Sequence, residues 1–166
     1  MLPWMVINRR ATQRQCTKCG GAFLIRADVK LEVLKLRDPK RGTLPTGDYT
    51  LRGLEDQLCV ERKSLSDLIG CMTSGRERFE REMQRMLAFP QRGGVIESSF
   101  SEMARGEYRS QLPGTTALNT LASWTGRFSL PFIFTDDRDN SAQYVTHFLI
   151  AAAKREYQRL KLLGGK

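Results

Sequence analysis

The chain has 166 residues, a length that suits one domain with a sizeable core. Hydrophobic residues make up 40% and charged residues 27%, as in soluble globular proteins, and no apolar run approaches the roughly 18–20 residues of a membrane span. The net charge of +9 favours a polyanionic partner, because phosphates attract cationic side chains and counterion release adds entropy. The apolar stretch at residues 2–7 is too short for a signal-peptide core. We therefore expect an intracellular protein that makes no membrane contact.

The first elements in chain order are weakly defined. Residues 1–28 form a polar N-terminal segment with one possible short strand at Met5 to Asn8, and residues 29–166 are predicted to form the main domain. Residues 29–36 alternate apolar and polar side chains, which predicts a strand. Residues 38–42 contain Asp-Pro and end in Gly, which predicts a turn.

A β-hairpin is predicted next. Strands at residues 48–52 and 57–63 flank four residues that begin with Gly and carry two acidic side chains, a typical turn composition. If the last residue of the first strand pairs with the first residue of the second, Asp48 falls directly opposite Glu61. Opposed residues have Cβ atoms about 4.5–5.5 Å apart, whereas a slip of one residue would put the two carboxylates on opposite faces.

Helices and strands alternate after this hairpin, which predicts an α/β sandwich with a mixed sheet. Ser64 followed by Asp67 is a capping-box pattern and marks the start of a helix, which gives Asp67 a purely structural interpretation. The further predicted elements are helices over residues 76–89, 100–105, 115–127 and 141–160 and strands over residues 94–97 and 131–134.

Two carboxylates and a lysine lie at the hairpin. Asp48 and Glu61 could hold one divalent cation, such as Mg²⁺ or Mn²⁺, with its remaining positions left to water and a substrate phosphate. Lys63 shares a strand face with Glu61, while Arg62 takes the other face. The lysine could orient the attacking water or stabilise charge that develops on a phosphate. This equipment suits hydrolysis of a phosphodiester, although a cross-strand cluster of surface charges would use the same residue types.

The order and spacing of these residues resemble the signature of the XPF/Mus-type structure-specific DNA endonucleases. The matching positions are Gly47, Asp48, Glu61, Arg62, Lys63 and Asp67. The flanking sequence also resembles small bacterial and phage members, and the resemblance extends over about residues 43–160. It implies an α/β, restriction-endonuclease-like fold, with a central mixed β-sheet flanked by helices, and Mg²⁺- or Mn²⁺-dependent DNA cleavage. By position, Asp48 and Glu61 would be metal ligands, Lys63 the catalytic lysine, and Arg62 and Asp67 supporting residues.

One part of the family pattern is altered. Members usually carry an earlier strand that ends in Asp-x-Arg-Glu, and the nearest match here has Asn8, Arg10 and Ala11 at those positions. Asn8 offers a carbonyl oxygen but no charge. The site is then weakened or altered, or the N-terminus is not equivalent, or Asp28 or Glu32 compensates. A second hypothesis is therefore a catalytically impaired DNA-binding or scaffold subunit of a nuclease complex.

Cys16 and Cys19, followed by two glycines, resemble half of a zinc site, but the sequence displays no obvious second half. Zinc could stabilise a nucleic-acid-binding module through them, or they could be two thiols in a surface loop. This is a third hypothesis.

Three further residues are candidates for the site or the DNA interface. Tyr108 and Arg109 lie in an expected loop where they could contact phosphate, or the ring could pack and the guanidinium remain solvated. Glu97 ends a predicted strand and could reach the edge of the same site, or it could be solvated. Many family members add a helix-hairpin-helix module, and none is visible after the last predicted helix. Selectivity for branched or flapped DNA would then need a homodimer or a protein partner.

Overall fold

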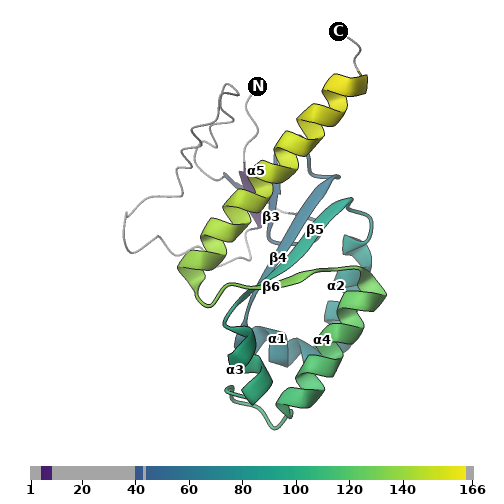
Figure 1. Cartoon of the computed structure of the whole chain (residues 1–166). Helices are drawn as coiled ribbons and strands as arrows, with labels where there is room; N and C mark the ends of the chain where they lie inside the picture. Colours follow the sequence, from purple (N-terminus) through teal and green to yellow (C-terminus); the bar gives the residue numbers. More distant parts are fainter. Residues whose placement is uncertain (1–4, 9–39, 43, 164–166) are drawn as a thin grey trace.

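The computed structural model describes residues 5–8, 40–42 and 44–163 (Figure 1). The elements are β1 (Met5–Asn8), β2 (Lys40–Gly42), β3 (Tyr49–Leu51), β4 (Leu58–Ser64), α1 (Leu65–Met72), α2 (Arg76–Met86), β5 (Gln91–Glu97), α3 (Phe100–Arg105), α4 (Gly114–Phe128), β6 (Phe132–Phe134) and α5 (Arg138–Leu163). They form one sheet in the order β2-β1-β3-β4-β5-β6. β1 and β3 are antiparallel, as are β3 and β4, and the other neighbours are parallel. The predicted α/β fold with a mixed sheet is confirmed.

The hairpin between β3 and β4 has the predicted register. Tyr49 pairs with Val60, and the Asp48 N–H donates to the Val60 carbonyl at 2.7 Å. Gly47 enters this hairpin with φ at +72°, and a Cβ there would lie 2.3 Å from the Cys59 sulfur. Only glycine fits both constraints. The Gly-Asp pair of the motif therefore has a structural cause: the glycine permits the turn that delivers the aspartate to the sheet.

β1 extends the same row of residues across the sheet. Ile7 pairs with Tyr49, and continuing this antiparallel register by one residue sets Asn8 opposite Asp48. Asn8, Asp48 and Glu61 thus occupy equivalent positions on three neighbouring strands. This placement supports the alignment in which Asn8 takes the position of the family's earlier aspartate.

Helices cover both faces of the sheet (Figure 1). On one face α5 packs its inner side against β3, β4 and β5, with Val60, Val95 and Leu149 in that core. On the other face α1, α2 and α4 enclose a second core, to which Cys59 and Ile96 belong. Because side chains alternate along β4, Glu61 and Lys63 face the α1–α2 layer and Arg62 faces α5.

Several predicted boundaries need correction. The turn predicted at residues 38–42 contains β2 instead, because Lys40–Gly42 pairs with β1 at the sheet edge. The apolar strand predicted at residues 131–134 would suit a buried position, but β6 is a half-buried edge strand with β5 as its sheet neighbour. The strand predicted at residues 29–36 lies outside the described residues, and the domain boundary near residue 28 stays a prediction.

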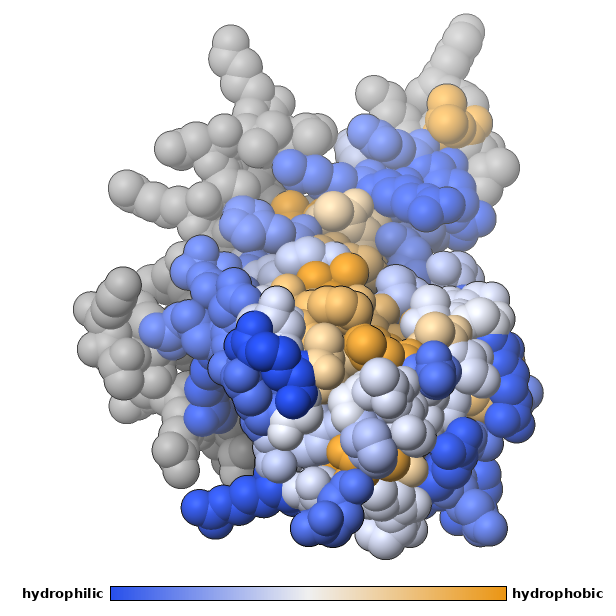
Figure 2. Space-filling view, turned by 60° about the horizontal axis from the view of Figure 1, so that its bottom comes forward, coloured by the Kyte–Doolittle hydropathy of each residue, from blue (hydrophilic) through white to orange (hydrophobic). Residues whose placement is uncertain are grey.

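The surface includes a strip of apolar side chains bordered by hydrophilic ones (Figure 2). Phe100 is 52% exposed and packs edge to face on Phe134, with ring centroids 5.5 Å apart.

Over the described ranges, no helix is both long and apolar enough to cross a membrane. The homodimer or protein partner stays a prediction.

Candidate active site

Glu61 and Asp48 form the centre of the site. Glu61 lies in the middle of β4 and is only 5% exposed. Asp48 lies just before β3, and its Oδ2 accepts the backbone N–H of Arg62 at 2.9 Å. This hydrogen bond holds the aspartate against β4, beside Glu61. Both predicted metal ligands are therefore brought together by the hairpin.

Burial makes this acidic pair costly without a cation. Burial raises the pKa of Asp48, although the Arg62 N–H and the Lys63 charge oppose the rise. Burial and the Asp48 charge raise the pKa of Glu61 to about 8, with Lys63 acting against them. The Lys63 ammonium does not offset the effects of burial and of the Asp48 carboxylate, so the pKa of Glu61 rises overall. A divalent cation would relieve the repulsion between the two groups.

Lys63 is fixed beside Glu61 on the same strand face. Its Nζ lies 2.5 Å from Glu61 Oε1 and 4.7 Å from the centroid of the Phe79 ring. Burial alone would lower the pKa of Lys63, but the Glu61 carboxylate raises it above the ordinary value. Lys63 is therefore a cation, suited to stabilising negative charge rather than to accepting a proton.

Glu82 is a site residue that the sequence analysis missed. The many Arg and Glu residues of the helix predicted at residues 76–89 are typical of a solvated face, yet Glu82 is half-buried in α2. It lies one turn from Phe79, on the side of the helix that carries Met83 and Met86. Its charge helps to raise the pKa of both Asp48 and Glu61. The signal in the sequence was its place in the same helical stripe as those three core residues.

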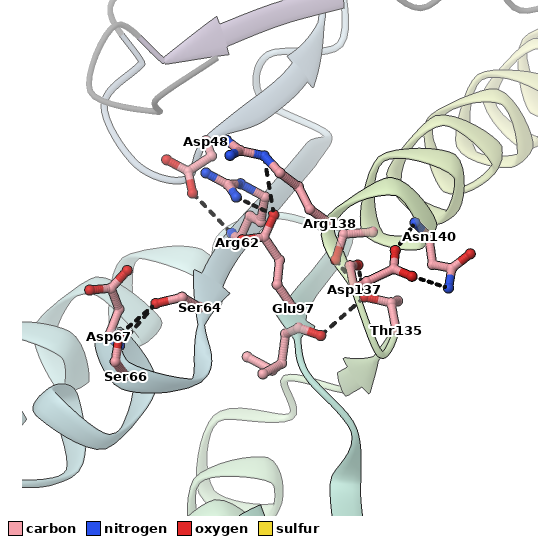
Figure 3. A network of polar contacts seen from close by, with 12 residues as sticks. Asp48, Arg62, Ser64, Ser66, Asp67, Glu97, Thr135, Asp137, Arg138 and Asn140 are labelled. Carbon is pink, nitrogen blue, oxygen red and sulfur yellow. Dashed lines mark hydrogen bonds and ion pairs between the residues drawn. The ribbon is translucent and has the colours of Figure 1, made fainter. Parts of the chain in front are cut away.

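Arg62 lies on the opposite face of β4 and joins a different network (Figure 3). Its Nη1 donates to Oε1 of Glu97, and Nε of Arg138 lies 3.9 Å from the same oxygen. Glu97 thus reaches the edge of the site, as the sequence allowed, but it does so on the arginine side. It connects the ends of β4 and β5 to the first turn of α5.

The sequence match covers most of the chain. Residues 15–148 match the ERCC4 domain family. The chain belongs to the ERCC4 domain family. The resemblance to XPF-type nucleases drawn from the motif is confirmed.

Solved structures support the fold of this ERCC4 domain. "XPF from Aeropyrum pernix" has a TM-score of 0.64 and 17% identity, over 96% of this chain and 69% of that one. "XPF from Aeropyrum pernix, complex with DNA" has a TM-score of 0.61 and 18% identity, over 92% of this chain and 66% of that one. No curated protein sequence matches the chain. The restriction-endonuclease-like architecture predicted from the sequence is confirmed.

Ser64 caps α1 in this ERCC4 domain, and Asp67, the last residue of the motif, lies in the first turn of that helix. The Asp67 backbone N–H donates to Ser64 Oγ at 3.1 Å, and the Asp67 side chain is exposed. The predicted start of the helix after Ser64 is confirmed. The support of the site by Asp67 stays a prediction.

Tyr108 and Arg109 lie in the loop between α3 and α4. The Tyr108 hydroxyl donates to the Leu112 carbonyl at 3.0 Å, and its ring packs against the core. Arg109 is exposed. The local structure therefore matches the packing interpretation of Tyr108, and the DNA contact by Arg109 stays a prediction.

The donors at the centre fit a hard divalent cation. Asp48 and Glu61 supply carboxylate oxygens, and Mg²⁺ is commonly held by one or two carboxylates while keeping several waters. Burial and the nearby carboxylates raise the pKa of the Cys59 thiol to about 12, so this neighbouring thiol is uncharged near neutral pH. Across the part of the chain that the structure describes, no three His, Cys, Asp or Glu side chains gather as a metal cluster. Cys16 and Cys19, the predicted half of a zinc site, lie outside that part.

The acidic run after β6, residues 136–139, leads into the first turn of α5. Asp137 Oδ1 accepts the Asn140 N–H at 2.8 Å, which caps α5. His147, farther along α5, is exposed.

Proposed function

We propose that this ERCC4 domain is a divalent-metal-dependent DNA endonuclease that hydrolyses phosphodiester bonds in branched or flapped DNA. The observation that carries the proposal is the buried pair of Asp48 and Glu61 with the Lys63 ammonium beside it. Two buried carboxylates with raised pKa values need a cation, and a lysine next to them is placed to meet an anion. The net charge of +9 supports a nucleic-acid partner. One solved relative is a complex with DNA, which supports DNA as that partner.

Asp48 and Glu61 would hold Mg²⁺ or Mn²⁺, which when bound supplies Lewis-acid polarisation of the phosphate. The Arg62 N–H keeps the Asp48 carboxylate turned toward Glu61. Lys63, charged because of its contact with Glu61, would stabilise the negative charge that develops on the phosphoryl oxygens. The Phe79 ring limits where the ammonium can move.

A catalytically impaired subunit is the alternative. Asn8 takes the position in the row beside Asp48 where family members carry an acidic residue. A chain that kept the fold and lost this charge would bind DNA and leave cleavage to a partner. We propose an intracellular location for either function.

Cleavage assays separate these functions. We would incubate labelled single-stranded, duplex, flap and fork DNA with the purified protein and Mn²⁺, and compare the Asp48→Ala and Asp56→Ala variants. Asp56 is an exposed aspartate in the β3–β4 turn, so it matches the change in charge away from the site. A nuclease loses cleavage in Asp48→Ala and on chelation, and keeps it in Asp56→Ala. DNA binding without cleavage would favour the impaired subunit.

A further inference from the structure

Lys63 contacts an aromatic ring as well as a carboxylate. Its Nζ lies 2.5 Å from Oε1 of Glu61 and 4.7 Å from the centroid of the Phe79 ring. The ring is 1% exposed and the lysine side chain 14%, so this contact is largely shielded from water. A ring face attracts a cation at this distance, most strongly where water is excluded. The ammonium is therefore held by α2 as well as by its own strand.

The Phe79 ring is itself held in place from α4. The rings of Phe79 and Trp124 meet edge to face, with centroids 5.3 Å apart and an angle of 69° between their planes. Trp124 is fully buried, and its indole N–H donates to Oε1 of Glu80 at 2.9 Å. Glu80 follows Phe79 directly in α2 and also accepts from Arg127 of α4, at 3.0 Å. These contacts join α2 to α4 next to the ring and leave it little room to turn.

The ring opposes a competing contact of the ammonium. Burial lowers the pKa of Lys63, and the charges of Glu61 and Glu82 both raise it, so two carboxylates act on the same ammonium. A lysine has three N–H donors on a flexible stem and could divide them between the two carboxylates. A donor turned toward Glu82 would be lost to an incoming phosphate. Attraction to the Phe79 face restrains the ammonium against this movement.

We propose that Phe79 is a positioning residue for the Lys63 ammonium, and that Trp124 acts through Phe79 by setting the orientation of its ring. The ring keeps the ammonium where it meets the negative charge that develops on the phosphoryl oxygens. Both aromatic side chains are buried, so neither can contact DNA itself. They act on the rate of hydrolysis and not on DNA binding. The inference rests on the proposed function, because Lys63 serves hydrolysis only if the domain cleaves DNA.

The first test is a double-mutant cycle in cleavage. We would measure kcat and KM for a labelled forked duplex with Mn²⁺ in the parent, Phe79→Leu, Lys63→Met and the double variant. Phe79→Leu should lower kcat by about tenfold and leave KM within about twofold, because a misplaced charge weakens only the transition state. In the Lys63→Met background there is no ammonium to place, so Phe79→Leu should lower kcat by less than about twofold. Equal falls in kcat in the two backgrounds would overturn the proposal.

Phe128→Leu is the matched control. Phe128 is buried in the same core and also faces a cation, since Cζ of Arg127 lies 4.8 Å from the centroid of its ring. The substitution removes the same volume from that core, so the thermal midpoint should fall in both leucine variants. The kcat of Phe128→Leu should stay at the parental value. A fall in kcat equal to that of Phe79→Leu would make the effect one of core packing and overturn the proposal.

A second readout needs neither DNA nor metal. A ring current shifts the ε-methylene protons of a lysine that lies over an aromatic face, and nuclear magnetic resonance would report them in EDTA, assigned by their absence in Lys63→Met. The shift should be lost in Phe79→Leu, reduced in Trp124→Phe and kept in Phe128→Leu. A parent without it, or a shift that Trp124→Phe leaves unchanged, would overturn the proposal. If the parent does not cleave DNA, the proposed function fails, and this measurement alone decides whether Phe79 places the ammonium.

Discussion

The two faces of β4 carry different clusters of charged side chains. On the α1–α2 face, Glu61 is accompanied by the carboxylates of Asp48 and Glu82, with Lys63 as their cation. On the α5 face, Arg62 shares one carboxylate with a second arginine. The first cluster contains three carboxylates and one ammonium, whereas the second joins guanidinium groups to the Glu97 carboxylate, although the two are neighbours along one strand.

This difference indicates what the acidic cluster needs. A structural ion-pair network would be expected to balance its buried charges, because unpaired charge in a protein interior is costly. Three carboxylates with one ammonium beside them are relieved by a cation. The acidic face is thus better explained by metal binding than by stability.

The largest effect is expected from removing the central charge of the acidic face. Glu61→Gln should reduce cleavage on the order of 10³-fold, because the cation loses a carboxylate ligand. Binding of forked DNA in EDTA should stay the same or tighten, since one negative charge near the phosphates is gone. Parallel loss of cleavage and binding would contradict a division of roles between the two faces, and parental circular dichroism would exclude misfolding.

The pH dependence of metal binding tests the same face. The pKa of Glu61 is raised to about 8, so at lower pH the carboxyl group is protonated and a cation must displace that proton. The apparent affinity for Mn²⁺ should therefore rise by about tenfold for each pH unit between about pH 6 and pH 8, and level off above. Free Mn²⁺ measured by electron paramagnetic resonance would report this. In Glu61→Gln the steep rise in Mn²⁺ affinity with pH should disappear. If the Mn²⁺ affinity of the parent protein is already constant from about pH 6, protonation of Glu61 does not compete with the cation.

A third carboxylate should strengthen the acidic face. Asn8→Asp adds a charge at the position opposite Asp48 in the β1–β3 register. We expect Mn²⁺ affinity and the cleavage rate to rise by about tenfold or more, as changes around metal ligands often produce effects of that size. If the parent protein does not cleave DNA and the Asn8→Asp variant does, the impaired-subunit hypothesis is favoured. No gain in either quantity would mean that Asn8 is not equivalent to the family's aspartate.

The sequence predicted the acidic face better than the arginine face because the two depend on contacts of different range. Asp48 and Glu61 are joined by a short hairpin, whose register follows from strand alternation and from Gly47. The Arg62–Glu97 contact is a diagonal pair across parallel strands, since Glu97 lies opposite Ser64. No periodic pattern in the sequence predicts such a contact.

Two other differences have local causes. The Asp-Pro and Gly residues around positions 38–42 favour a turn, yet pairing with β1 makes residues 40–42 a strand. Glu82 was missed because glutamates with i,i+4 arginine neighbours are typical of a solvated helix face. Its inward position follows only from the packing of α2.

The arginine face can be altered without changing its positive groups. Glu97→Gln removes the carboxylate that both guanidiniums share. Cleavage should fall by about tenfold, because the arginines beside the acidic pair are no longer held in place, while DNA affinity in EDTA is retained or increased. Separate kcat and KM values for the fork substrate would check this. A fall in affinity in Glu97→Gln would show that Glu97 acts mainly on folding, which its thermal midpoint would also report.

The smallest expected effect concerns Glu82, which acts on the acidic face only through its charge. Glu82→Gln should lower Mn²⁺ affinity by about three- to fivefold. A carboxylate that acts on the cation through its charge alone contributes about 1 kcal/mol of attraction. Glu77→Gln is its control, because Glu77 lies on the same helix with a side chain that is 91% exposed. DNA affinity in EDTA should change in neither variant. If the two variants lowered Mn²⁺ affinity equally, the negative excess beside Glu61 would be a property of the whole helix surface, and Glu82 would have no special place in the site.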